Sequence, residues 1–174
     1  MFNLSALLQP DLVLGSSILS LTPEIIRQHN LQGMILDVDD TLVPFTAANI
    51  SPELAAWASQ VRPLVSLWLV SNNTSHVRIS RIAQSLDLPY VSGAGKPSRR
   101  KLKQAAADMD LPVERIAMVG DRLFTDVLAG NRLGMFTVLV NPMVDPAKEA
   151  TVSPVHALEV WISERLGVSL QGLQ

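Results

Sequence analysis

A short apolar run leads directly into a group of aspartates early in the chain. The segment GMIL (33–36) is followed by Asp37, Asp39 and Asp40, so three like charges fall within four positions. Carboxylates packed this closely at the end of a buried strand destabilise a fold unless a cation compensates them. The segment therefore predicts both a buried strand and a cationic partner at its end.

From Gly33 onward, apolar runs alternate with segments whose apolar residues have helical spacing. We expect five strands in the runs GMIL, LVSLWLV (64–70), PYVS (89–92), RIAMVG (115–120) and FTVLV (136–140). Continuous apolar strands separated by amphipathic helices predict a mostly parallel sheet with helices on both faces, a Rossmann-like α/β fold. The length of 174 residues suits a single domain, 1–174.

The two ends of the chain fit this alternation less clearly. We expect residues 1–32 to form a helical extension packed on or beside the core. Within it, TPEIIRQHN (22–30) predicts a short helix that is capped by Thr22. Near the other end, Leu158, Trp161 and Ile162 have the spacing of a closing helix, and we assign Trp161 to the core.

Composition excludes several classes of protein. A net charge of only −2, from 14 basic and 16 acidic residues, gives no reason to expect a nucleic-acid partner. The chain has no cysteine, so disulfides and thiolate metal sites are excluded. Its longest apolar stretch, 12–21, is shorter than the ~20 residues that span a bilayer. No basic residue precedes Arg27, so the basic start of a secretory signal peptide is missing. We expect a cytoplasmic protein with at most peripheral contact at the inner membrane surface.

Polar residues follow four of the predicted strands, at the point where each strand ends. They are Asp37 to Thr41, SNNT (71–74), GAGKPS (93–98) and GDRLFTD (120–126). The carboxyl ends of parallel strands share one edge of the sheet, so these residues should converge there. Several carboxylates in a small volume favour a hard divalent cation, and Mg²⁺ is the usual one where phosphate is bound.

These residue types are suited to phosphoryl transfer. An aspartate can attack phosphorus, and a second carboxylate two positions later can transfer the proton. A hydroxyl with backbone N–H groups can hold phosphate oxygens, and a lysine can stabilise their charge. Each motif alone has an ordinary structural explanation, such as a turn, a helix cap or a solvated lysine. Their order at successive strand ends favours the catalytic interpretation. An EF-hand is excluded because Leu42 and Ala48 occupy its required glycine and glutamate positions.

The motifs DVDDT (37–41), SNN (71–73), GKP (95–97) and GDRLFTD resemble those of the haloacid dehalogenase (HAD) superfamily of phosphatases, subclass IIIA. Carried over by motif, the resemblance assigns roles to individual residues. It implies that Asp37 is the nucleophile and a metal ligand. Asp39 would be the general acid and base and would bind metal through its backbone carbonyl.

The same resemblance implies roles for the later motifs. Ser71 and Asn72 would bind the substrate phosphate, and Lys96 would stabilise its negative charge. Asp121 would ligate Mg²⁺, and Asp126 would support the metal site next to the direct ligands. Only 33 residues separate Asp37 from Ser71, and 24 separate Ser71 from Lys96, so no cap domain fits between them.

A wider stretch resembles a capless subgroup that includes phosphatidylglycerophosphate phosphatases of mitochondria, plastids and bacteria. It comprises LTPEIIRQHNLQGMILDVDDTLVPF, SNN and VGDRLFTDVLAGNRLGM. The resemblance implies conversion of phosphatidylglycerophosphate to phosphatidylglycerol. Asp40 departs from the subgroup, where asparagine is expected more often. The alternatives are a phosphatase of a soluble nucleotide, sugar phosphate or phosphoprotein, and a HAD-fold binding module without turnover.

Two features fit an anionic phospholipid as the substrate. KPSRRKLK (96–103) holds five of the 14 basic residues and could attract an anionic headgroup or membrane surface. The apolar residues of the N-terminal segment could contact the membrane interface. Each feature has a simpler alternative: a solvated basic helix face for the first, and packing against the sheet for the second. The oligomeric state has no signature in the sequence.

Overall fold

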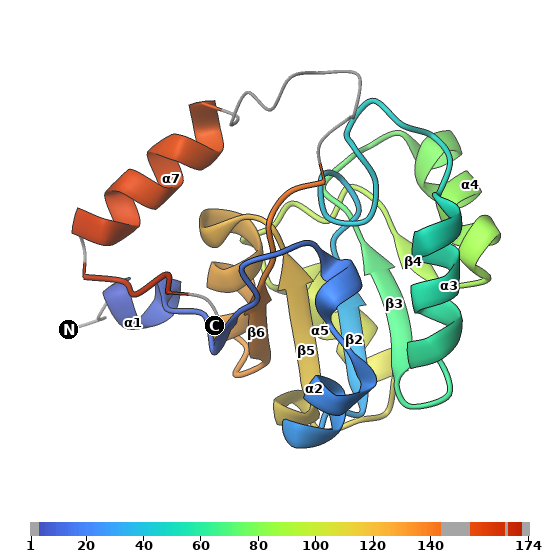
Figure 1. The fold of residues 1–174 in the computed structure, drawn as a ribbon, viewed down its shortest axis with the longest axis horizontal. Helices are drawn as coiled ribbons and strands as arrows, with labels where there is room; N and C mark the ends of the chain where they lie inside the picture. Colours follow the sequence, from blue (N-terminus) through green and yellow to red (C-terminus); the bar gives the residue numbers. More distant parts are fainter. Residues whose placement is uncertain (1–3, 144–153, 166, 172–174) are drawn as a thin grey trace.

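The computed structural model describes residues 4–143, 154–165 and 167–171, and these build a parallel sheet flanked by helices (Figure 1). The sheet has six strands in the order β1-β6-β5-β2-β3-β4, and every pairing is parallel. The strands are β1 (Leu12–Val13), β2 (Gly33–Leu36), β3 (Ser66–Val70), β4 (Tyr90–Val91), β5 (Ile116–Gly120) and β6 (Phe136–Leu139). The five predicted strands are present, and β1 is an additional one.

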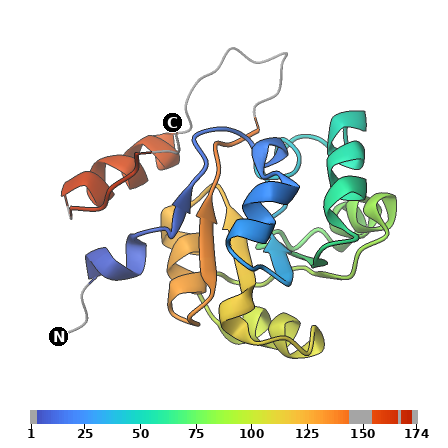
Figure 2. The same ribbon diagram turned by 60° about the horizontal axis from the view of Figure 1, so that its bottom comes forward.

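Helices cover both faces of this sheet (Figure 2). One apolar cluster joins β2 to residues of α3 and α4, and a second joins the opposite side of β2 and β5 to residues of α5. The α-helices are α1 (Leu4–Leu8), α2 (Pro23–Gln28), α3 (Pro52–Val61), α4 (His76–Leu86), α5 (Arg100–Asp108), α6 (Leu128–Asn131) and α7 (Pro154–Arg165). Two 3₁₀ turns, Ile18–Ser20 and Val113–Arg115, and a π-helical turn, η3 (Leu123–Val127), complete the elements.

The central strands are apolar on both faces because both faces are covered. All residues of β2 and of β5 are buried, and β2 lies between β3 and β5. Met34 pairs with Leu67 on one side and with Ala117 on the other. This register brings the ends of β2, β3 and β5 to the same level, so the loops that follow them meet at one edge of the sheet.

Local signals begin the helices of the first half. The Thr22 side chain accepts a hydrogen bond from the Ile25 N–H, and Pro23 occupies the first turn of α2, as predicted. The Ser51 hydroxyl accepts one from the Leu54 N–H at the start of α3, where Pro52 follows. These caps fix where α2 and α3 begin.

The N-terminal segment joins the sheet as well as packing beside it. β1 pairs with β6, and the Leu14 N–H donates to the Leu139 carbonyl at 2.9 Å. The Asp11 carboxylate accepts hydrogen bonds from both the backbone N–H and the hydroxyl of Thr137, at 2.7 and 3.0 Å. The expected helical extension therefore contains an edge strand that side-chain contacts fix in place.

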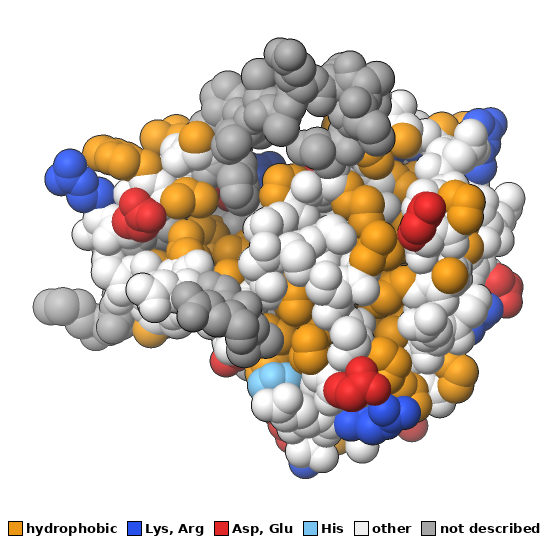
Figure 3. All heavy atoms as spheres, in the orientation of Figure 1, with side chains coloured by type: hydrophobic (Ala, Val, Ile, Leu, Met, Phe, Trp, Pro, Cys, Tyr) orange, Lys and Arg blue, Asp and Glu red, His pale blue; other side chains and the backbone are white. Residues whose placement is uncertain are grey.

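The closing helix α7 lies at the margin of the molecule (Figure 1). Trp161 is 54% exposed and Leu158 is 55% exposed, so the assignment of Trp161 to the core was wrong. Figure 3 shows apolar side chains at the surface over α7. By contrast, Trp57 is buried and donates its indole N–H to the Leu21 carbonyl at 2.9 Å. None of the helices in the described ranges is long and apolar enough to cross a membrane.

Close packing around Gly130 predicts that a larger residue at this position destabilises the fold. A Cβ at this position would lie 2.6 Å from the Thr137 methyl group and 2.9 Å from the Met118 Cβ. Glycine to alanine normally stabilises a helix by about 1 kcal/mol. Here we expect Gly130→Ala to lower the free energy of unfolding by about 1–3 kcal/mol, because the methyl group overfills the contact with β5 and β6.

Urea unfolding followed by circular dichroism measures this change. Gln60→Ala, at an exposed position of α3, is the matched control and should stay within about 0.5 kcal/mol of the native chain. A Gly130→Ala protein as stable as this control would show that the packing around α6 relaxes without loss.

Candidate active site

Three buried carboxylates meet at the carboxyl edge of the sheet. Asp37 follows β2, Asp121 follows β5, and Asp126 lies one turn further along in η3. Each offers an oxygen atom that lies within 4.8 Å of those of the other two. The carboxylates are only 1–7% exposed as residues, so water contributes little to their solvation. The predicted convergence of these aspartates is thus present in the fold.

Lys96 lies among these carboxylates. Its Nζ is 2.6 Å from Asp37 Oδ1 and 2.7 Å from Asp126 Oδ1, and it donates to the Val70 carbonyl at 2.9 Å. The lysine side chain is 1% exposed. The Asn72 side chain holds the backbone of Lys96 through two hydrogen bonds, 2.7 and 3.0 Å long. Lys96 therefore compensates part of the carboxylate charge, and the SNNT loop positions it.

Burial dominates the protonation of these groups. It raises the pKa of Asp37 to about 7, with the Asp126 charge adding to the rise and Lys96 opposing it. It likewise raises the pKa of Asp121 to about 8, and the charges of Asp126, Asp37 and Asp40 add to that rise. Burial alone would lower the pKa of Lys96, but its two carboxylate partners outweigh burial and raise it. Without a further cation, Asp37 and Asp121 are therefore protonated more easily than free aspartates, whereas Lys96 keeps its charge.

Asp39 points to a different cation. Its carboxylate forms an ion pair with Arg78, and the Ser71 hydroxyl lies 3.4 Å from its other oxygen. Arg78 also donates to the backbone carbonyls of Ala47 and Pro44, at 2.8 and 3.2 Å. Each guanidinium nitrogen thus has an acceptor, so the orientation of Asp39 is fixed. Arg78 lies in α4 outside the recognised motifs, and the sequence analysis did not identify it.

The remaining predicted residues shape the loops around the cluster. Ser71 is fully buried, and its hydroxyl accepts a hydrogen bond from the Asn73 N–H at 3.0 Å. The Thr41 hydroxyl donates to Asp121 at 3.2 Å. Asp40 has a φ of 59°, a conformation that asparagine and aspartate tolerate best, and its carboxylate accepts a hydrogen bond from the Phe45 N–H. Asp40 therefore acts as a turn residue here, besides adding its charge.

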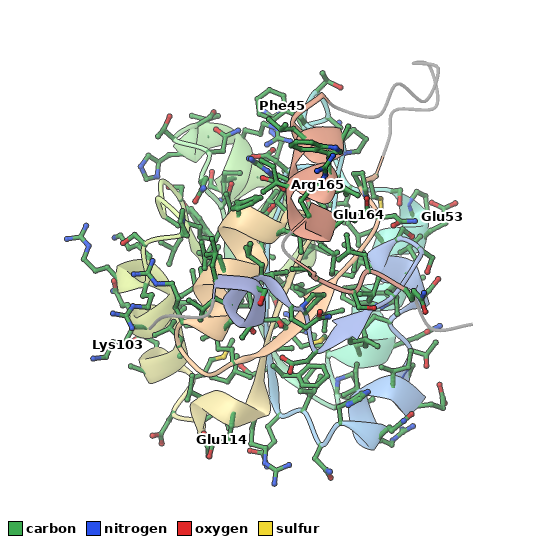
Figure 4. The ribbon with its side chains drawn as sticks, turned by 90° about the vertical axis from the view of Figure 1, so that its left-hand side faces the viewer. Phe45, Glu53, Lys103, Glu114, Glu164 and Arg165 are labelled. Carbon is green, nitrogen blue, oxygen red and sulfur yellow. The ribbon has the colours of Figure 1, made fainter. Side chains whose placement is uncertain are left out.

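A cavity of about 410 Å³ opens above these groups. Phe45 is 62% exposed at its rim, and Figure 4 shows it at the upper end of the molecule. In the same view Lys103 projects from α5 well away from Phe45. Among the described residues, no cap domain covers this edge of the sheet. The cavity is lined by Asp37, Asp39, Asp40, Phe45, Asn72, Asn73, Thr74, Lys96, Asp121, Arg122 and Thr125.

Arg122 and Glu159 are further site residues that the sequence analysis missed. Arg122 lines the cavity, and its guanidinium donates to the Glu159 carboxylate of α7 at 2.8 and 3.2 Å. Glu159 is 5% exposed, although it lies on a helix at the margin of the molecule. One signal for it exists in the sequence. Glu159 lies three residues before Ile162, on the face of the predicted helix that the apolar residues mark.

Comparison with known proteins agrees with this geometry. Residues 93–158 match the family described as HAD-hydrolase-like. The chain is 26% identical over 149 residues to the chloroplastic phosphatidylglycerophosphate phosphatase 1 of Chlamydomonas reinhardtii, covering 79% of this chain and 55% of that protein. A solved structure of an uncharacterised Listeria monocytogenes protein shares the fold, with a TM-score of 0.54 and 14% identity over 78% of this chain and 99% of that one.

The probable phosphatase YqeG of Bacillus subtilis is more similar in sequence. The two chains are 35% identical over 128 residues, which covers 73% of this chain and 74% of YqeG. The similarity extends over most of both proteins, well beyond short motifs. Together with the aspartate cluster at the sheet edge, it shows that this chain belongs to the HAD-like hydrolases and is a phosphatase of that family.

Proposed function

We propose that the protein is a Mg²⁺-dependent phosphomonoesterase that forms an aspartyl-phosphate on Asp37, and that its substrate is phosphatidylglycerophosphate. The observation that carries the proposal is the Asp37 carboxylate itself. It lies at the floor of the cavity, 2.6 Å from the Lys96 ammonium and beside two further carboxylates. The fixed positive charge of Lys96 reduces the repulsion between the Asp37 carboxylate and an anionic phosphoryl group, so the carboxylate can approach phosphorus.

The donor set fits Mg²⁺. Hard oxygen ligands suit this ion, and Asp37, Asp121 and Asp126 each offer a carboxylate oxygen within 4.8 Å of the other two. We assign the carboxylates of Asp37 and Asp121 and the backbone carbonyl of Asp39 as ligands. Asp126 would complete the site, while its contact with Lys96 keeps that lysine in place. The bound ion would neutralise these carboxylates and the phosphate oxygens.

The residues of the chain then divide the two chemical steps between them. A carboxylate oxygen of Asp37 bonds to phosphorus as the bond to the leaving oxygen breaks, and Asp39 gives that oxygen a proton. Asp39 next takes a proton from the water that attacks the aspartyl-phosphate, which frees phosphate and restores Asp37. The Ser71 hydroxyl and the Asn72 side chain would bind phosphate oxygens, and Lys96 would stabilise their charge.

Two observations support the lipid substrate. The similarity to a phosphatidylglycerophosphate phosphatase extends over 79% of this chain. The open cavity also admits a phosphate whose remaining bulk stays outside the protein, as the acyl chains of a lipid would. Such a substrate would bring the working protein to a membrane surface. The exposed basic residues Arg99, Arg100 and Lys103 are candidates for that contact, whereas Leu8, Leu12 and Leu14 of the N-terminal segment are buried in the fold.

The direct test is phosphate release from phosphatidylglycerophosphate in mixed micelles. We expect turnover with Mg²⁺, none with EDTA, and a loss of at least about a thousandfold in Asp37→Asn, since an amide is not a nucleophile. Asp108→Asn, an exposed position on α5, is the control and should keep full activity. Hydrolysis of soluble phosphates alone would replace the lipid with another substrate. Native Mg²⁺-loaded protein without Asp37-dependent turnover of any phosphomonoester would favour a binding module.

The Arg78 contacts predict a role in positioning Asp39. We expect Arg78→Ala to lower kcat by about 10–100-fold with a smaller change in KM, because the acid and base loses its fixed orientation. Arg78→Lys should recover part of the loss, since it restores the charge without the three-way hydrogen bonding. Arg81→Ala, exposed on the same helix, is the matched control. An unchanged kcat in Arg78→Ala would contradict the role.

The carboxylate cluster predicts how stability depends on pH without metal. The folded pKa values of Asp37 and Asp121 lie above the unfolded value of 3.8, so their protonated forms favour the folded state. That contribution is full below about pH 4 and is lost as pH rises through 7 to 8. We expect the metal-free protein to melt about 3–6 °C lower at pH 8.5 than at pH 6.

Asp121→Asn isolates the contribution of Asp121 to the pH dependence of the melting temperature. The variant should lose less stability between the two pH values, and Mg²⁺ should raise its melting temperature much less than that of the native chain. Scanning calorimetry at both pH values, with Mg²⁺ or EDTA, measures both quantities. Equal Mg²⁺ stabilisation of the two proteins would remove Asp121 from the metal site.

A further inference from the structure

Arg122 is anchored to the carboxylate cluster at its backbone and reaches the cavity with its side chain. It directly follows Asp121, and its backbone N–H donates to Asp126 Oδ2 at 3.2 Å. The residue lines the cavity together with Asp37 and Lys96. Its side chain is 41% exposed, in contrast to the 1% of Lys96. Arg122 is therefore a cation near the reacting groups that a ligand can reach.

Glu159 fixes the guanidinium of Arg122. One carboxylate oxygen accepts hydrogen bonds from Nε at 3.2 Å and from Nη2 at 2.8 Å, and the other accepts the Leu123 N–H at 3.2 Å. Because Glu159 is buried and held at both oxygens, it cannot follow a mobile arginine. The arginine is thus held in one orientation before any ligand arrives, which reduces the entropy lost on binding.

The hydrogen bonds with Glu159 leave part of the Arg122 guanidinium free to bind a ligand. A guanidinium has five N–H bonds, and Glu159 takes one from Nε and one from Nη2. Among the contacts of the described residues, Nη1 has no acceptor. The Nη1 and Nη2 edge can therefore donate two parallel hydrogen bonds to a phosphate or carboxylate group. Lys96, the other cation lining the cavity, already contacts Asp37 and Asp126.

We propose that Arg122, held by Glu159, binds a second anionic group of the substrate. The preferred substrates are phosphomonoesters whose alcohol carries a phosphodiester, phosphate or carboxylate a few bonds from the reacting phosphorus. This inference rests on the proposed phosphatase activity of the same site. Phosphatidylglycerophosphate belongs to this class, because its phosphodiester lies across one glycerol from the phosphomonoester. The selectivity needs only the headgroup, so soluble molecules can test it.

The experiment compares two soluble substrates. One is glycerophosphoglycerophosphate, the headgroup without acyl chains, and the other is p-nitrophenyl phosphate, which has no second anion. We expect the native enzyme to favour the headgroup in kcat/KM. Arg122→Ala should lower kcat/KM for the headgroup about 10–30-fold, mainly through KM, and change that for p-nitrophenyl phosphate by about twofold or less. High salt should weaken the effect, because the arginine is partly exposed.

Two further variants separate binding from a structural role. Arg122→Lys should keep a fraction of the preference, since it retains the charge and loses the two-pronged contact. Arg165→Ala removes an exposed arginine of α7 that stacks on Trp161, and it should leave both substrates unaffected. Figure 4 shows Arg165 on this helix. Circular dichroism confirms that each variant is folded.

Binding provides a readout that does not require turnover. Calorimetry on Asp37→Asn should give tighter binding of the headgroup than of p-nitrophenyl phosphate, and adding Arg122→Ala should abolish the difference. An equal loss of affinity for both ligands would mean that Arg122 has only a structural role, linking α7 to the site, and would overturn the inference. No loss of affinity for either ligand would also overturn it. Selective binding without Asp37-dependent hydrolysis would reject the proposed phosphatase reaction while the second-anion site stands.

Discussion

The contact of Lys96 with Asp37 and Asp126 is the interaction on which the site depends. Burying one cation among three carboxylates is unfavourable unless hydrogen bonds and loop geometry hold every group in place. The Asn72 amide holds the Lys96 backbone, and the Val70 carbonyl accepts from its ammonium. Lys96 also comes from a loop that follows the edge strand β4. The order of strands in the sheet therefore brings the loop with Lys96 to the same edge as the carboxylates.

The fold was predictable where burial leaves a long apolar signal. β2 and β5 are buried at every residue, so their apolar runs stand out from the helical periodicity around them. β1 has two residues, too few for any periodicity, and Asp11 and Thr137 hold it through side chains far apart in sequence. Trp161 followed the helical pattern, but α7 packs through Glu159 and leaves the tryptophan exposed.

The site was predictable for a topological reason. Asp37, Ser71 and Asp121 each follow a strand, and parallel strands bring such positions to one edge. Arg78 and Glu159 lie on helices, where arginine and glutamate are usually solvated. Their roles come from tertiary contacts that no spacing rule contains. Only the position of Glu159 among the apolar residues of α7 could have suggested burial.

The rim of the cavity carries groups that lie apart from the carboxylate cluster, among them the exposed Phe45. Arg78 connects the site to the rim of the cavity: it forms an ion pair with Asp39 and lies 5.9 Å from the centre of the exposed Phe45 ring. Arg122 makes a second connection, through Glu159, to α7. The sheet edge holds the buried carboxylates, whereas a loop and a marginal helix hold the more exposed Phe45 and Arg122. If Arg122 binds part of the substrate as proposed, changes in that loop or helix would alter the substrate while the carboxylate cluster stays intact.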